Sequence, residues 1–142
     1  MLVRELMTTD VVTVDVDATL QAAVGRLLAE EVGSVVVVND GAPAGIVTET
    51  DALTAAHERG QSLGAIPVRD LARPPLVTTD PDRTIRGVAR TMAEEGIKKV
   101  VVTEDLSVVG IVTLTDIVSR FADLQQEAAA AADIAERDWR GD

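Results

Sequence analysis

The apolar residues of the first half of the chain predict a strand, a helix, two further strands and a second helix. Residues 11–14 are typical of a short extended segment. The helix that follows is indicated by apolar residues at a spacing of three and four, namely Leu20, Ala23, Val24, Leu27 and Leu28. Thr19 is its expected N-cap, and Gly33 is expected to end it. The valine run over residues 34–38 is typical of a buried strand, and residues 45–48 predict its hairpin partner.

The second half repeats this pattern at an offset of 65 residues without a gap. Between positions 3 and 53, 19 of the 51 residues are identical to the residue 65 positions further on. The densest match joins residues 45–51 to residues 110–116. A repeat of this kind predicts two similar units, and units of about 60 residues would be marginal alone, so we expect the halves to share a core. The expected organisation is repeat 1 at 1–65, repeat 2 at 66–123, and a helical or frayed tail at 124–142.

Charge and composition narrow the classes of partner. The formal net charge is −11, and the chain has 13 basic and 24 acidic residues. Such a surface is expected to repel nucleic acid and anionic lipid. The chain has no cysteine, and no apolar run approaches the ~20 residues that span a bilayer, so we expect a cytoplasmic protein without disulfides or zinc-thiolate sites. The single histidine, His57, is expected to be a solvated helix residue rather than a metal ligand.

The repeated strand-to-helix junctions carry the candidate chemistry. In the first, Thr48 ends a strand and Asp51 lies in the first turn of the next helix; in the second, Thr113 and Asp116 do the same. The threonine hydroxyl and the free N–H groups of a first helical turn can hold a phosphate, and the carboxylate can accept bonds from the two hydroxyls of a ribose. The alternative is that both residues simply cap their helices. Duplication of the whole block favours a nucleotide site.

These residues give the chain its resemblance to a known family. The motif Gly-apolar-x-Ser/Thr-x-x-Asp after a strand is complete at both 45–51 and 110–116, and the repeat resembles the cystathionine-β-synthase (CBS) domain over residues 3–123. The pair resembles the tandem arrangement called a Bateman module. The resemblance implies an α+β fold in which two tandem β-α-β-β-α repeats pack sheet to sheet about a pseudo-twofold axis. It also implies two clefts that bind adenine nucleotides or S-adenosylmethionine as regulatory ligands, with no obligatory cofactor.

The same resemblance implies which residues form each cleft. One cleft would combine residues of both repeats, namely Ile46, Thr48, Asp51, Val77, Thr78, Ile97, Lys98 and Lys99. The other would be formed by Val12, Thr13, Val32, Gly33, Ile111, Thr113 and Asp116. Lys98 and Lys99 are the only lysines of the chain, and we expect them to reach ligand phosphates in the first cleft. The alternative is that they point to water. Gly33 and Ser34 stand at the matching positions of the second cleft.

Three functions are compatible with these features. The leading hypothesis is a non-catalytic sensor of an adenosine-containing molecule, which forms a homodimer and signals to an effector protein. The first alternative is a structural dimerisation module with vestigial clefts. The second is a nucleotide-processing enzyme, which is disfavoured because we identify neither catalytic residues nor metal ligands. Contact residues for the dimer are expected on the helices after the two aspartates, namely Ala52, Leu53, Ile117 and Val118. Trp139 in the tail is expected to lie in a frayed end rather than to anchor a partner.

Overall fold

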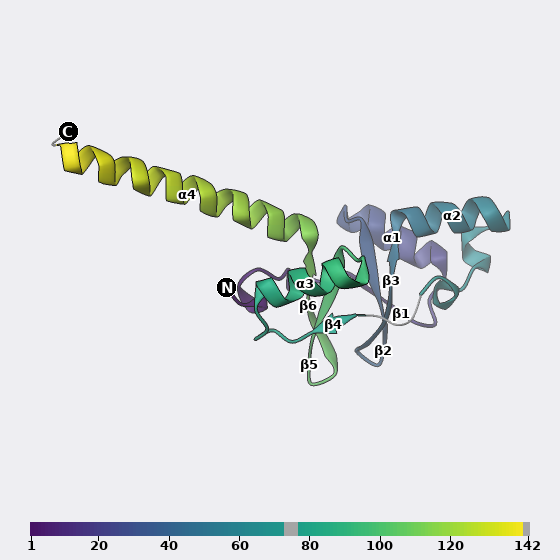
Figure 1. The fold of residues 1–142 in the computed structure, drawn as a ribbon. Helices are drawn as coiled ribbons and strands as arrows, with labels where there is room; N and C mark the ends of the chain where they lie inside the picture. The colour runs from purple at the N-terminus through teal and green to yellow at the C-terminus, as the bar shows by residue number, and fades with distance from the viewer. Residues whose placement is uncertain (73–76, 141–142) are drawn as a thin grey trace.

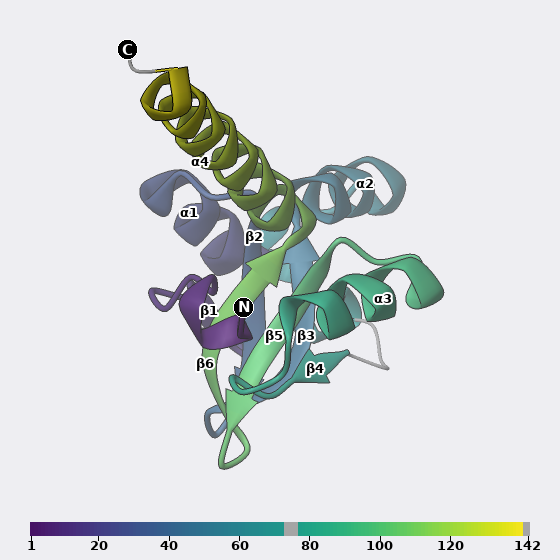
Figure 2. The same cartoon turned by 60° about the vertical axis from the view of Figure 1, so that its left-hand side comes forward.

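The computed structural model describes residues 1–72 and 77–140, and it describes side chains as far as residue 136. Two three-stranded sheets lie side by side, and their helices lie on the outside (Figures 1 and 2). The first half contains β1 (Thr13–Asp15), α1 (Leu20–Glu30), β2 (Ser34–Asn39), β3 (Ala42–Thr48) and α2 (Glu49–Arg59). The second half contains β4 (Thr78–Thr79), α3 (Ile85–Glu95), β5 (Lys99–Glu104), β6 (Ser107–Thr113) and α4 (Leu114–Arg140). The predicted α+β fold of two β-α-β-β-α repeats is confirmed.

Each sheet mixes parallel and antiparallel pairing in the same way. β2 pairs in parallel with β1 and antiparallel with β3, and β5 does the same with β4 and β6. Along the central strands, Val35 and Val37 pack on the helices of their own unit, whereas Val36 points to the opposite face. Val36 and its counterpart Val101 are both buried. The continuous valine runs therefore reflect strands that are covered on both faces.

The helix boundaries follow local chemistry. Thr19 is an N-cap as predicted, and its counterpart Thr84 in the second repeat is one too, because their hydroxyls accept hydrogen bonds from the N–H of Ala22 (3.2 Å) and Gly87 (3.1 Å). The predicted end of α1 at Gly33 is wrong. The last helical residue is Glu30, and its C-cap is Glu31, which lies two residues before Gly33 and adopts a left-handed backbone with φ 54°. The matching residue after α3 is Gly96, at φ 64°, and a glycine carries no steric penalty in this conformation.

The short segments that precede each repeat are exchanged between the halves. The 3-10 helix η1 (Val3–Glu5) packs on the second unit, where the N–H of Val3 donates to the carbonyl of Arg83 at 2.8 Å. The 3-10 helices η2 (Leu63–Ala65) and η3 (Val68–Asp70) lie against the first unit, where the N–H of Val68 donates to the carbonyl of Ala18 at 2.9 Å. Each unit is therefore completed by a lead-in segment from the other half of the sequence.

This exchange changes the expected organisation of the core. The buried side chains form two clusters rather than a single core shared by both halves. Ile66, Val68 and Leu71 belong to the cluster of the first unit, and Val3 belongs to that of the second. Burying an aliphatic side chain of this size stabilises the fold by about 1.5–3 kcal/mol. The halves therefore depend on one another through these segments as well as through the contact between their sheets.

Thr79 is a polar residue inside the second unit. It is 7% exposed, and its hydroxyl has no hydrogen-bond partner among the residues that the structure describes. The matching residue of the first unit is Val14, which is buried in the apolar cluster. A buried unpaired hydroxyl costs about 1–3 kcal/mol, so Thr79→Val is expected to raise the free energy of unfolding by about 1 kcal/mol. Urea denaturation would measure this. The reverse variant Val14→Thr is the matched control and should lower stability, and a neutral or destabilising Thr79→Val would contradict the prediction.

Helix α4 continues through most of the predicted tail. It is a single helix from Leu114 to Arg140, and it extends away from the body of the molecule (Figures 1 and 2). Ala128 to Ala132 are all exposed. Alanine has the highest helix propensity, which favours a helix here even without a packed face. The tail is therefore helical through Arg140 rather than frayed, and the side chain of Trp139 lies outside the described residues.

Candidate functional site

Both strand-to-helix junctions form reciprocal capping boxes. The hydroxyl of Thr48 accepts from the N–H of Asp51 at 3.1 Å, and a carboxylate oxygen of Asp51 accepts from the N–H of Thr48 at 2.9 Å. The equivalent distances for Thr113 and Asp116 are both 3.1 Å. The capping role weighed from the sequence is therefore present in both repeats. It also fixes each carboxylate in one orientation while leaving acceptor capacity on its second oxygen.

The glycine that opens each motif is explained by the exchanged lead-in segments. A Cβ on Gly45 would lie 2.6 Å from the Cβ and 2.9 Å from the Cα of Ala72. A Cβ on Gly110 would lie 2.7 Å from the sulfur of Met7 and 3.1 Å from the carbonyl oxygen of Thr8. Each glycine thus lets the lead-in from the other half cross the last strand. The crossing brings the segment after Met7 alongside the second junction.

The second junction lines a cavity of about 240 Å³ between the two repeats. Six of the seven residues expected in this cleft line it: Val12, Val32, Gly33, Ile111, Thr113 and Asp116. Thr13, the seventh, lies in β1 beside the cavity and is half-buried. Ser34, which the repeat places at the position matching Lys99, also lines the cavity. Five further lining residues were not assigned to this cleft from the sequence, namely Thr8, Asp10, Val11, Val36 and Lys99. Thr8, Asp10 and Val11 belong to the lead-in segment of repeat 1. They were missed because the repeat does not show on which unit this segment packs.

The first junction is less enclosed by the described residues. Asp51 lines a pocket of about 150 Å³ along α2, together with residues of the lead-in such as Asp70 and Leu71. The segment 73–76, which matches residues 8–11 of the first lead-in, lies outside the described residues. The expected members of this cleft are spread over several environments. Ile46 is half-buried opposite Val36, Val77 and Ile97 pack on the second apolar cluster, and Thr78 and Lys98 are exposed.

Lys99 lies near both junctions. It was predicted beside Asp51, and it also lines the cavity that contains Asp116. Its side chain is half-buried, and burial lowers the pKa of its ammonium group, while the negative charges of Glu49 and Asp51 oppose that shift. Lys99 thus lies between the two junctions, within electrostatic reach of one and in the cavity wall of the other.

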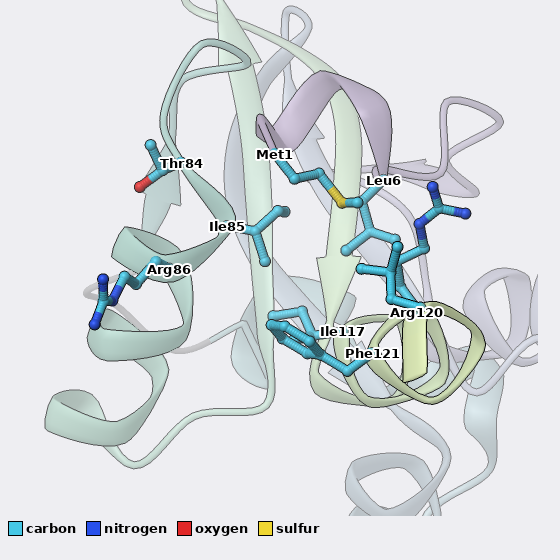
Figure 3. Close-up of a pocket in the computed structure, with 9 residues that line it drawn as sticks. Met1, Leu6, Thr84, Ile85, Arg86, Ile117, Arg120 and Phe121 are labelled. Carbon is cyan, nitrogen blue, oxygen red and sulfur yellow. The ribbon is translucent and has the colours of Figure 1, made fainter. Parts of the chain in front are cut away.

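Two apolar pockets lie on the outer helices, away from the aspartates. The larger, of about 430 Å³, lies between η1, α3 and the first turns of α4, and Figure 3 shows Met1, Leu6, Ile85, Ile117 and Phe121 converging on it. The smaller, of about 290 Å³, lies between α1 and α2 and is lined by Leu28, Ala52 and Leu53 among others. These pockets mark the faces on which the dimer contacts were predicted.

Comparison with known proteins identifies the family. Residues 3–58 and 68–123 each match the sequence model of the CBS domain. The chain is 30% identical over 115 residues to the CBS domain-containing protein YhcV of Bacillus subtilis, with 81% of each protein covered. It is 34% identical over 139 residues to protein MJ1404 of Methanocaldococcus jannaschii, a match that covers 89% of this chain and 33% of that relative. The chain therefore belongs to the CBS domain family, and it spans a third of the length of MJ1404.

Solved structures agree on the fold. The CBS domain pair of protein MJ0100, solved in complex with 5′-methylthioadenosine and S-adenosyl-L-methionine, matches with a TM-score of 0.76 at 24% identity, covering 87% of this chain and 97% of that one. Within residues 1–72 and 77–140, no helix is both long and apolar enough to cross a membrane. The same described residues hold no group of three or more histidine or acidic side chains placed to bind a metal ion.

Proposed function

We propose that this protein is a non-catalytic regulatory module that binds an adenosine-containing molecule, either an adenine nucleotide or S-adenosylmethionine, between its two CBS repeats. The observation that carries the proposal is the cavity beside Asp116. It unites the Thr-Asp junction of repeat 2 with apolar and backbone groups of repeat 1, namely Val12, Val32 and Gly33. The binding of two adenosyl compounds by MJ0100, which has the same fold, supports this class of ligand.

The chemistry of the cavity suits the parts of such a ligand. Asp116 is half-buried and held by the N–H of Thr113, so its remaining acceptor capacity can bind the two hydroxyls of a ribose. The N-terminus of α4 supplies a positive helix end for a phosphate, while the N–H groups of Leu114 and Asp116 already donate to the carbonyl of Lys98 and the hydroxyl of Thr113. Val11 and Val12 provide an apolar surface against which a purine can lie. Binding would bridge the two repeats and shift the population of their relative orientations, which an effector protein in the cytoplasm would detect.

Calorimetric titration with AMP, ATP and S-adenosylmethionine tests this proposal. We expect saturable binding of at least one of them and no turnover in a parallel assay of nucleotide hydrolysis. Absence of binding by all three would favour the structural dimerisation module with vestigial clefts. Turnover that is lost in a cavity variant would favour an enzyme instead.

The exposed helix faces support a homodimer. Leu53 is 73% exposed on α2 and Val118 is 60% exposed on α4, next to the two apolar pockets. Exposed apolar side chains on outer helices favour an interaction site, and symmetric pairing is the commonest arrangement. We expect a dimer by light scattering, and the variant Leu53→Glu, Val118→Glu should shift it to monomer, because charges would be buried in the interface.

A control separates this effect from a general change in surface charge. Leu106 is 83% exposed in the β5–β6 turn, away from these helices, so Leu106→Glu should leave the dimer intact. A monomeric parent at high concentration, with and without nucleotide, would refute the predicted dimer.

A further inference from the structure

We infer that Lys99 couples the two clefts, so that an anionic ligand beside Asp116 promotes the binding of a cationic adenosyl ligand beside Asp51. The inference rests on the proposed function and concerns how its two sites regulate each other. It arises from a departure from the internal symmetry of the molecule. The position that matches Lys99 in repeat 1 is Ser34, so the pair of clefts shares one central lysine rather than having one each.

Strand register places Lys99 between the clefts. On β5 it pairs with Thr113, the motif threonine of the second junction, and on β2 Ser34 pairs with Thr48, the motif threonine of the first. Although they belong to different repeats, Lys99 and Ser34 line the same cavity. Glu49 approaches this region from α2, since its N–H donates to the carbonyl of Gly33 at 3.1 Å and its carboxylate lies 3.9 Å from where a Cβ on Gly33 would be.

Acidic residues of both junctions attract the ammonium group of Lys99. Among the described residues that line the cavity, Lys99 is the only basic one, and Asp10 and Asp116 are acidic. On the other side, Glu49 and Asp51 in the first turn of α2 attract the same ammonium group. Lys98, the other lysine, is exposed. An anion in the cavity therefore has one cation available to it, and that cation already balances part of the charge beside Asp51.

Coupling follows from moving this one charge. When ligand phosphates draw the ammonium group towards the cavity, Glu49 and Asp51 lose part of their positive partner, and their cleft becomes more negative. A sulfonium compound such as S-adenosylmethionine would then bind there more tightly, whereas a second ATP would bind more weakly. Because linkage is reciprocal, S-adenosylmethionine should raise the affinity for ATP by the same factor.

The test is a titration of one ligand in the absence and presence of the other. We expect saturating ATP to increase the affinity of the protein for S-adenosylmethionine at least about fivefold, within the usual range of coupling between sites. Lys99→Ser, which restores the residue of the symmetric position, should weaken ATP binding and reduce the coupling factor to about one. Arg26→Ser is the matched control and should keep the coupling, because it removes one positive charge from an exposed position on α1 that lines neither the cavity beside Asp116 nor the pocket beside Asp51. Lys99→Gln, which keeps more of the side-chain length, serves as a second variant, and circular dichroism checks that both fold.

The outcomes distinguish this inference from the proposed function. If the parent binds neither ATP nor S-adenosylmethionine, both ideas are overturned. If the parent binds both ligands independently, with a coupling factor of one, the role of Lys99 is refuted while the nucleotide site stands. Coupling that survives in Lys99→Ser and Lys99→Gln would also refute the role of Lys99. Coupling in the parent that disappears in these variants and persists in Arg26→Ser would support it.

Discussion

The variant Asp51→Ala, Asp116→Ala is expected to lose binding of adenosine nucleotides. Each carboxylate is oriented by its own capping box, at 2.9 Å from the N–H of Thr48 and 3.1 Å from that of Thr113, and each is proposed to bind a ribose. Removing a charged acceptor of two hydroxyls costs on the order of 2–4 kcal/mol per site, which weakens binding by about 30-fold to 1,000-fold. Calorimetry should show one site lost in each single variant and no binding in the double variant.

A control is needed because each aspartate also caps a helix. Loss of a cap costs about 1 kcal/mol of stability, so a folding effect could imitate a binding effect. Thr19→Ala removes the cap of α1, which lies outside both clefts, and should lower stability by a similar amount while leaving nucleotide affinity unchanged. Asp116→Asn keeps an acceptor for the N–H of Thr113 but removes the charge, and it should bind more weakly than the parent. Parent-like binding by the double alanine variant would show that the ribose assignment is wrong.

Local features of this fold could be predicted because they depend on residues close in sequence. The N-caps at Thr19 and Thr84, the buried valine strands and the two junctions all follow from periodicity and short-range hydrogen bonds. The end of α1 could not be predicted in the same way. There Glu31 takes up a left-handed conformation that a glycine would adopt more easily.

The long-range features could not be read from the repeat. An offset of 65 residues is the same whether each lead-in packs on its own unit or on the other one, so the sequence does not distinguish the exchanged arrangement. The position of Lys99 also depends on this arrangement and on how the sheets meet, so its place in the wall of the cavity beside Asp116 could not be predicted. The cavity residues of the lead-in, such as Thr8 and Asp10, were missed for the same reason.

The variant Gly45→Ala is expected to lower the free energy of unfolding by about 2–3 kcal/mol, because it places a methyl group against the crossing lead-in. The nearest atoms are the Cβ and Cα of Ala72, at 2.6 and 2.9 Å, and a backbone atom cannot move without shifting the segment. Overpacking of this kind typically costs about 1–3 kcal/mol. Gly110→Ala should cost less, since its nearest contact is the end of the flexible Met7 side chain.

Compensating variants show whether the close approach is the cause. Ala72→Gly should restore part of the stability lost in Gly45→Ala, and Met7→Ala should do so for Gly110→Ala, as measured by urea denaturation in two double-mutant cycles. Gly25→Ala is the matched control, because nothing lies within 4 Å of its added Cβ inside α1, and it should be neutral or stabilising by up to about 1 kcal/mol. Gly110→Ala should also weaken nucleotide binding beside Asp116, since Thr8 follows Met7 into the cavity wall. If Gly45→Ala proves as stable as Gly25→Ala, the lead-in does not cross this strand, and the exchange of segments between the repeats is refuted.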